Sequence, residues 1–321
     1  MAFTLVEILV AMAIFAMLAT LLFGVLSQVN KTWQQAQSQI EPRKSGRAIL
    51  DYITRELEMA SLPEVRGMNY SNTSSSPDST DLNLQFLENP SQANSAFLNP
   101  HAIFWQAPVA SVTTNGNMAE VGYFIRWDVS NPNNPRALLC RLLVNPSDTN
   151  YLIYSSPNAW LSDAILDSAA PGVKNTGDPA NSYKGWFADN VIGLWARSLD
   201  ARGNPITNSA LNAAYVNYAY DSRKGYRYQV GTNVIIKSGF QSAGTTNQIF
   251  ATLPASVEVA LVILDSRAAS RLTQKPVYTN TWPPTATSFW TDVNRFVSNL
   301  PTAVRSGSRI YSTRVALKNA D

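Results

Sequence analysis

The chain has 321 residues, of which 45% are hydrophobic and 15% charged, so it can bury one large core or two modest ones. The net charge of +3 is small and the Lys and Arg residues are scattered, which argues against nucleic-acid binding. The single cysteine, Cys140, excludes an internal disulfide and argues against a thiolate metal site. No Walker A, G-x-G-x-x-G, H-E-x-x-H or G-x-S-x-G motif accompanies the single histidine, His101. We therefore expect no catalytic site, no metal and no cofactor.

The first predicted element is an apolar helix over residues 3–26, in which Glu7 is the one charged residue. Residues 8–26 would span about 28 Å as a helix, close to the hydrocarbon thickness of a bilayer. An acidic residue in a membrane helix costs up to roughly 3 kcal/mol, so Glu7 is expected to have a function. Two alternatives are a signal anchor whose Glu7 reaches back to the interface, and a cleaved secretory signal. The apolar core of a secretory signal is shorter, about 7 to 15 residues.

The segment Phe3-Thr4-Leu5-Val6-Glu7-Ile8-Leu9-Val10-Ala11 resembles the N-terminus of type IV pilins and of type II secretion pseudopilins. The resemblance implies that a prepilin peptidase cuts between Ala2 and Phe3 and methylates the new amine of Phe3. Glu7 would then pair with the Phe3 amine of a neighbouring subunit in a filament. Residues that would line the membrane and filament helix are Ile8, Leu9, Val10, Ala11, Ile14, Phe15, Leu18, Leu21, Leu22 and Phe23.

Two features depart from the family pattern. The family's leader is usually longer, basic and ends in Gly, whereas residues 1–2 alone precede Phe3 here, and we interpret them as a residual leader. The nearest basic residues, Lys31, Arg43 and Lys44, follow the helix, and the positive-inside rule alone would place the rest of the chain in the cytoplasm. The resemblance implies the opposite topology, with one membrane span and a periplasmic head.

Residues 27–62 are predicted to form an amphipathic stalk helix. From residue 49 onward, apolar residues recur at three-to-four-residue spacing, which predicts one face packed on a globular head. Pro42 predicts a bend or break near Glu41, because a proline inside a helix removes a hydrogen bond. The buried face would include Ile49, Tyr52, Ile53, Leu57 and Ala60, and charge would come from Arg47, Asp51, Arg55, Glu56 and Glu58.

The segment 47–60 is also similar to minor subunits, of the J type in type II secretion and the W type in type IV pili. A looser similarity to prepilin-like proteins of Verrucomicrobia extends over Thr32-Trp33, residues 190–194 and residues 253–259. Both resemblances imply a minor-type subunit.

The head, residues 63–321, is predicted to be rich in antiparallel strands. It opens with a Ser-rich loop over 63–81, and the turn chemistry of 130–135 joins two strands in a hairpin. The strand with the clearest pattern, 256–264, is expected to be central in a sheet, and a helix start or turn is expected at 265–271. The predicted strands are 82–87, 121–128, 136–144, 190–199, 256–264 and 310–317.

The expected fold class is α+β: a long N-terminal helix, membrane-spanning in its first half, packed on a β-rich antiparallel head. The resemblance implies as partners other pilin or pseudopilin subunits, the prepilin peptidase, an inner-membrane assembly platform and, before assembly, membrane lipid. Filament or cell-surface localisation would follow assembly. Trp282, flanked by prolines, is a candidate partner-facing residue, whereas Trp127 and Trp195 are expected in the core.

Three other possibilities remain open from the sequence. The chain could be a membrane-anchored periplasmic binding module that does not polymerise. It could instead be an anchored enzyme that uses carboxylates such as Glu120 or Asp128. Calcium could bind at Asp200, or at Asp163 and Asp167, although none of these segments has the spacing of an EF-hand loop, which favours ordinary turns.

Overall fold

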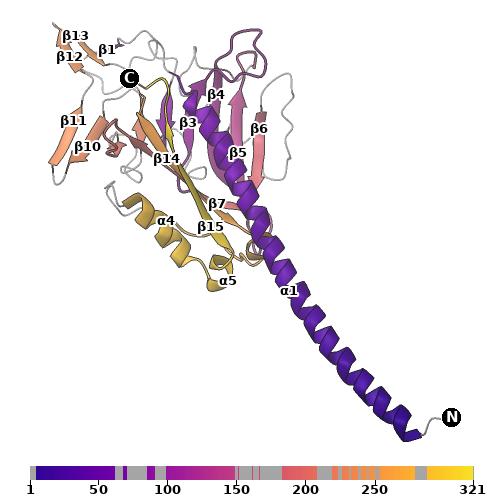
Figure 1. Ribbon diagram of the computed structural model, residues 1–321. Coiled ribbons are helices and arrows are strands. Elements are labelled where there is room, and N and C mark those ends of the chain that lie inside the picture. Colours follow the sequence, from indigo (N-terminus) through magenta and orange to yellow (C-terminus); the bar gives the residue numbers. More distant parts are fainter. Residues whose placement is uncertain are drawn as a thin grey trace.

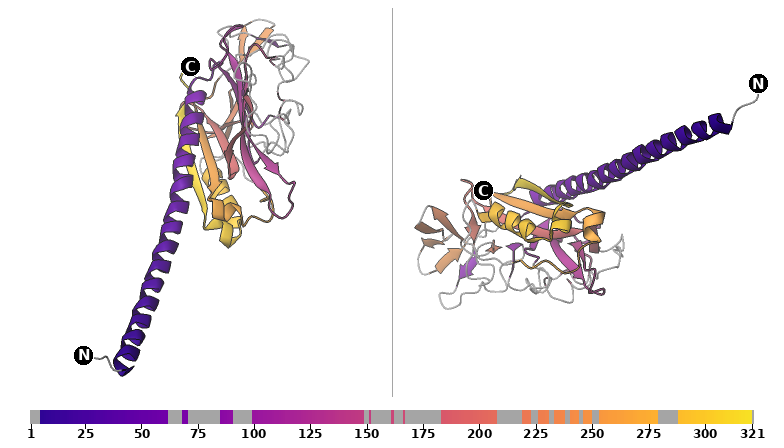
Figure 2. Two further views of the ribbon diagram at one scale, coloured as in Figure 1. Left: turned by 90° about the vertical axis from the view of Figure 1, so that its right-hand side faces the viewer. Right: turned by 90° about the horizontal axis from the view of Figure 1, so that it is seen from below.

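One long helix and a β-rich head make up the protein (Figure 1). The computed structural model describes residues 5–61, 68–70, 85–90, 99–148, 151, 161, 166, 183–207, 219–222, 226–230, 233–237, 240–243, 246–249, 253–278 and 288–320. Helix α1 (Leu5–Glu58) has 54 residues. Its C-terminal part lies along the head, and its N-terminal part extends away from it (Figure 2). The α+β class is thus confirmed at the level of an apolar N-terminal helix and antiparallel sheets.

Two sheets form the main body of the head. The larger sheet is antiparallel with the order β6-β5-β4-β3-β2-β9, and the smaller one has the order β15-β14-β7. In the smaller sheet β14 is central, as its continuous apolar pattern predicted. The strands of these two sheets are β2 (Phe86–Glu88), β3 (Ile103–Ala107), β4 (Ala119–Asp128), β5 (Arg136–Val144), β6 (Tyr183–Asp189), β7 (Val191–Leu199), β9 (Tyr220–Asp221), β14 (Ser256–Leu264) and β15 (Ser308–Ala316).

Shorter elements complete the described head. Two further three-stranded sheets have the orders β1-β13-β12 and β11-β10-β8. The strands are β1 (Met68–Tyr70), β8 (Ile206–Thr207), β10 (Tyr226–Val230), β11 (Asn233–Lys237), β12 (Phe240–Ala243) and β13 (Thr246–Ile249), and the helices are α3 (Ser266–Ala269), α4 (Ser288–Asn299) and α5 (Thr302–Arg305).

The strand predictions for the central head are confirmed. The β4–β5 hairpin pairs Asp128 with Arg136 across the predicted turn. The helix start expected after residue 264 is α3, where the Asp265 side chain accepts a hydrogen bond from the Ala268 N–H. Of the predicted strand at 82–87, residues 86 and 87 lie in β2, and residues 82–84 lie outside the described residues.

The main core lies between the two large sheets and the C-terminal part of α1. Alternate residues of β4 point to opposite faces, as a strand requires: Tyr123 lies in the main core, and Phe124 packs in a second cluster on the far face of the larger sheet. Cys140 lies in that second cluster and is fully buried. Of the two expected core tryptophans, Trp195 is fully buried and Trp127 partly so.

The prediction was a bend or a break near Glu41, and the break is wrong, because helix α1 continues through Pro42. A proline removes one backbone hydrogen bond and crowds the preceding turn, at a cost of about 3 kcal/mol. This loss is confined to one turn of a 54-residue helix whose last turns are held by tertiary contacts. Packing on the head and the helical residues on either side therefore outweigh the local penalty.

Candidate functional site

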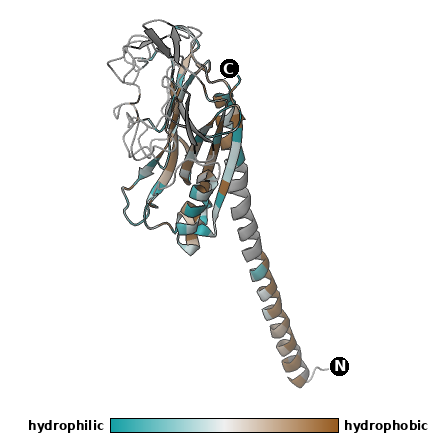
Figure 3. Ribbon diagram, turned by 90° about the vertical axis from the view of Figure 1, so that its left-hand side faces the viewer, coloured by the Kyte–Doolittle hydropathy of each residue, from teal (hydrophilic) through white to brown (hydrophobic). Residues whose placement is uncertain are grey.

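The N-terminal half of α1 is made mostly of apolar residues, as the brown ribbon in Figure 3 shows, and most of its described side chains are exposed. An 18-residue window, Met12–Val29, has a mean hydropathy of 2.1 and is long and apolar enough to cross a membrane. A monomeric soluble protein rarely exposes so large an apolar surface, so in the cell this helix needs a covering of lipid or protein. More than half of each of these side chains is exposed: Leu5, Val6, Leu9, Val10, Met12, Ile14, Phe15, Met17, Leu18, Leu21, Leu22, Phe23, Val25, Leu26 and Val29.

The site residues expected from the sequence fall into three groups. Glu7, Ile8 and Ala11 lie within α1, although their side chains are outside the described part of the chain. Ala2, Phe3 and Trp282 lie outside the described residues altogether. The remaining predicted helix residues are exposed on α1, namely Leu9, Val10, Ile14, Phe15, Leu18, Leu21, Leu22 and Phe23.

The C-terminal half of α1 lies against the smaller sheet. Ile49, Ile53 and Leu57 are buried in the main core, as the helical spacing predicted. Gly46 lies tightly against this sheet, because a Cβ at this position would lie 2.6 Å from the Tyr311 ring on β15. The absence of a side chain at residue 46 thus allows the helix backbone to approach the sheet where α1 first reaches the head.

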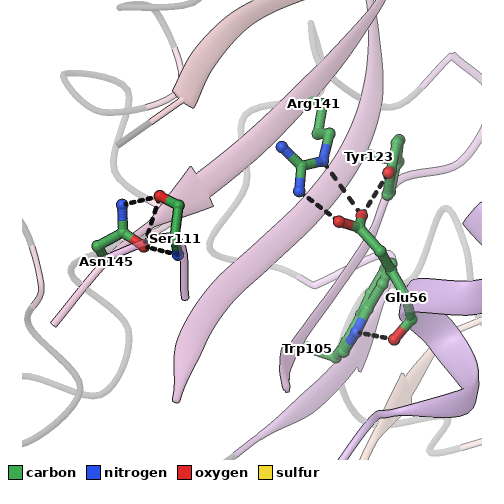
Figure 4. Close-up of polar contacts among 6 residues, drawn as sticks. All are labelled: Glu56, Trp105, Ser111, Tyr123, Arg141 and Asn145. Carbon is green, nitrogen blue, oxygen red and sulfur yellow. Dashed lines mark hydrogen bonds and ion pairs between the residues drawn. The ribbon is translucent and has the colours of Figure 1, made fainter. Parts of the chain in front are cut away.

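A buried polar cluster links the last turns of α1 to the larger sheet (Figure 4). Arg141 on β5 forms an ion pair with Glu56, with 3.1 Å between its Nε and Glu56 Oε2. Tyr123 on β4 donates its hydroxyl to the same Oε2 at 2.5 Å, and the Trp105 indole donates to the Glu56 carbonyl at 3.1 Å. These contacts fix the helix to the two strands β4 and β5 and to β3.

The environment of this cluster keeps its charges paired. Burial lowers the pKa of Arg141, but hydrogen bonds and charge attraction to Glu56 outweigh that effect, so its pKa lies above the usual value. Burial and the Glu56 charge both raise the pKa of Tyr123 well above its usual value. The Arg141 guanidinium also lies 5.2 Å from the centre of the Tyr52 ring. Glu56, expected among the charged solvent-facing residues, is therefore buried, because Arg141 and Tyr123 supply its partners.

A second buried polar cluster joins the two large sheets. Glu88 on β2 is fully buried, and its Oε2 accepts hydrogen bonds from the Ser198 N–H at 3.0 Å and the Ser198 hydroxyl at 2.7 Å. Burial raises the pKa of Glu88 to about 8, against the opposing effects of Ser198 and Arg197. Arg197 itself pairs with Glu258 on β14. No sequence signal distinguished Glu88 from a surface glutamate at the end of a short strand.

The residues considered for catalysis do not come together. Glu120 and Asp128 lie at opposite ends of β4, about 26 Å apart at 3.3 Å per residue. Glu120 is fully buried, and hydrogen bonds from Ser130 lower the pKa of Asp128. His101 is fully buried, and this burial lowers its pKa to about 3.

Of the aspartates considered for calcium binding, the structure describes Asp200 alone. Within the described ranges, no group of three or more His, Cys, Asp and Glu side chains is arranged to hold a metal ion. Asp200 forms a turn, with its Oδ1 accepting from the N–H groups of Arg202 and Asn204, each at 2.8 Å. Asp163 and Asp167 lie outside the described residues.

Comparison of the chain with models of known protein families, with characterised proteins and with solved structures found no match. The function is therefore argued from the residues and geometry described above.

Proposed function

We propose that this chain is a structural subunit, of minor pilin or pseudopilin type, of a type IV pilus or a type II secretion-like filament. The observation that carries the proposal is the exposed apolar half of a helix whose other half is fixed to a folded head. Residues Leu5 to Ala11 of the pilin-like sequence form the start of this helix. An anchor that is removed after export would not need the buried Glu56 cluster that joins it to the head.

In this proposal a prepilin peptidase cuts between Ala2 and Phe3 and methylates the amine of Phe3. Before assembly, α1 spans the inner membrane once and the head lies in the periplasm. An assembly platform then moves the helix from lipid into the filament core, where the apolar surface packs on other subunits. Small residues favour close packing of helices in such surroundings, and the candidates are Ala11, Ala13, Ala16, Ala19 and Gly24.

Glu7 has a specific role in this assembly. A carboxylate and an ammonium about 4 Å apart attract by about 4 kcal/mol at an effective dielectric constant near 20, before the cost of desolvation. Pairing of Glu7 with the Phe3 amine of the next subunit therefore sets the axial register between neighbouring helices.

Replacing Glu7 by Ala should reduce incorporation into sheared surface filaments at least tenfold while leaving the amount of membrane-bound chain unchanged. The measurement is the ratio of filament to membrane protein by quantitative immunoblotting. Glu58→Ala is the matched control, because Glu58 is in the same helix but forms only a partly exposed ion pair with Lys318. Equal incorporation of both variants would remove the assembly role of Glu7 and favour a membrane-anchored binding module that does not polymerise.

A further inference from the structure

Four arginines gather at one end of the head. Arg267 lies in α3 and Arg271 lies two residues after it, Arg305 ends α5, and Arg309 is the second residue of β15. Helices α3 and α5 contact each other, and the Asp265 N–H donates to the Gly307 carbonyl at 3.0 Å. Arg267, Arg271 and Arg305 are exposed and Arg309 is half-buried. We call these four residues the arginine end.

The arginine end has little compensating charge. Residues 265–271 and 300–309 contain these four cations and one carboxylate, Asp265, which is occupied in capping α3. Within the described part of the chain none of the four arginines forms an ion pair. The exposed Asp189 lies at the edge of this region, in a groove that also includes Asp265 and Ser266.

Backbone contacts hold two of the guanidinium groups at the surface. Arg305 donates from Nη1 to the Ser298 carbonyl, 3.0 Å away at the end of α4. Arg309 donates from Nη1 to the carbonyls of Ser308 at 2.8 Å and Ser306 at 3.3 Å. These bonds use neutral acceptors, so the positive charge is not neutralised and stays available to an anionic partner.

The arginine end faces the direction in which the apolar half of α1 leaves the head. Helix α5 lies at the end of the head nearest the N-terminal part of α1 in both side views (Figures 1 and 2). The apolar window of α1 ends at Val29, and Ser45 lines the groove beside α3. The part of the helix between these two residues is about 24 Å long at 1.5 Å per residue. Membrane helices tilt by about 20° on average. Tilting α1 toward the side that carries the head brings the arginine end down toward the membrane surface.

We propose that the arginine end binds the anionic headgroups of the membrane in which α1 is anchored. This rests on the part of the proposed function that puts α1 in a membrane, and not on filament assembly. Each basic residue near an anionic membrane surface increases association about fivefold. The contact holds the unassembled subunit tilted, with its head on the lipid surface, and it is lost when α1 leaves the bilayer.

The test uses the full chain in lipid nanodiscs that carry a headgroup acceptor dye. A donor dye is attached at Ala303→Cys, an exposed position on α5. Burial raises the pKa of the Cys140 thiol to about 12, so the native cysteine stays unreactive and is left in place. The discs contain phosphatidylcholine alone or phosphatidylcholine mixed with phosphatidylglycerol. Energy transfer should be high only in the phosphatidylglycerol discs at about 0.15 M salt, and should fall at about 1 M salt, where the Debye length is about 3 Å.

The triple variant Arg267→Gln, Arg271→Gln and Arg305→Gln should weaken the association about 100-fold and lower the energy transfer to the phosphatidylcholine level. The matched control removes three exposed cations from the opposite end of the head and from the end of α1, and it should leave the energy transfer in phosphatidylglycerol discs unchanged. Its substitutions are Arg55→Gln, Arg202→Gln and Lys318→Gln. A donor at Ala201→Cys, also at the opposite end, should report low transfer in every disc.

Energy transfer that does not depend on lipid charge or salt in the Ala303→Cys chain with all its arginines overturns the proposal, and this arm does not depend on the folding of the triple variant. Retention of transfer in the triple variant also overturns it. The discs are first purified and assayed for bound chain. A chain that fails to co-purify with the discs contradicts the membrane anchor itself, and the lipid contact with it, whereas a chain that co-purifies without charge-dependent transfer contradicts the lipid contact alone.

Discussion

Replacement of Arg141 by Met should destabilise the folded head by about 3 to 5 kcal/mol, since it leaves the Glu56 carboxylate buried without its cation. The loss should appear as a lower midpoint of urea unfolding, followed by tryptophan fluorescence of the full chain in detergent. Glu56 joins α1 to the larger sheet, so the substitution should also make the end of α1 exchange its amide hydrogens faster.

A second substitution tests whether the buried charge is the cause. The double variant Glu56→Gln with Arg141→Met should recover most of the lost stability, because the glutamine keeps an acceptor for the Tyr123 hydroxyl and removes the unpaired charge. Lys318→Met is the matched control, since it breaks the more exposed pair with Glu58 and should cost less than about 1 kcal/mol. Equal effects of Arg141→Met and Lys318→Met would show that the buried pair is not a principal attachment of α1.

Replacement of Glu88 by Gln should stabilise the protein at pH 8 and have little effect near pH 4.5. The pKa of Glu88 is raised from 4.5 to about 8 in the folded state, so the folded protein binds a proton that the unfolded chain has released over this interval. Stability from this group is fully present below pH 4.5 and falls by about 1.4 kcal/mol per pH unit until pH 8, or roughly 5 kcal/mol in total. Glutamine removes this dependence and keeps an acceptor for the Ser198 N–H and hydroxyl.

The measurement is the free energy of urea unfolding of both proteins between pH 4.5 and 8.5. The difference between Glu88→Gln and the unsubstituted chain should grow with pH and level off above about pH 8. Glu58→Gln, which removes a partly exposed carboxylate, is the matched control. A constant difference across the pH range would mean that Glu88 is ionised in the folded protein at neutral pH, contrary to the effect of its burial.

The strands that could be predicted are those whose pattern is local. β5 and β14 match the predicted ranges, because each is a mostly apolar run bounded by turn residues. β4 begins two residues earlier than predicted, and β15 begins two residues earlier and ends one residue earlier. The burial of Ile53 and Leu57 likewise followed from helical spacing alone.

The elements that were missed depend on distant partners or lack a clear period. β3 is buried on both faces, so its residues do not alternate, and β6 contains Lys184, Gly185 and Asp189, which weaken a strand pattern. α4 could have been found, since Phe289, Val293 and Phe296 have helical spacing and are all buried. Its position against Arg197 and Trp195 could not, because those contacts cross about a hundred residues.

For the candidate site too, the local features could be predicted from the sequence and the long-range contacts could not. The apolar helix and the pilin-like segment around Glu7 can be identified in one short stretch of sequence. The attachment of that helix could not be predicted, because Glu56 finds Tyr123 and Arg141 at separations of 67 and 85 residues. A glutamate on a charged helix face is usually solvated, and only the assembled sheet shows that this one is buried.

The central claim is that the chain is processed at Phe3 and assembled through α1. Its most direct test is N-terminal mass spectrometry of the protein isolated from its native membrane. The account predicts a chain that begins at Phe3 with one methyl group on its amine. A native protein that retains Met1, or that begins at Phe3 without the methyl group, would contradict it.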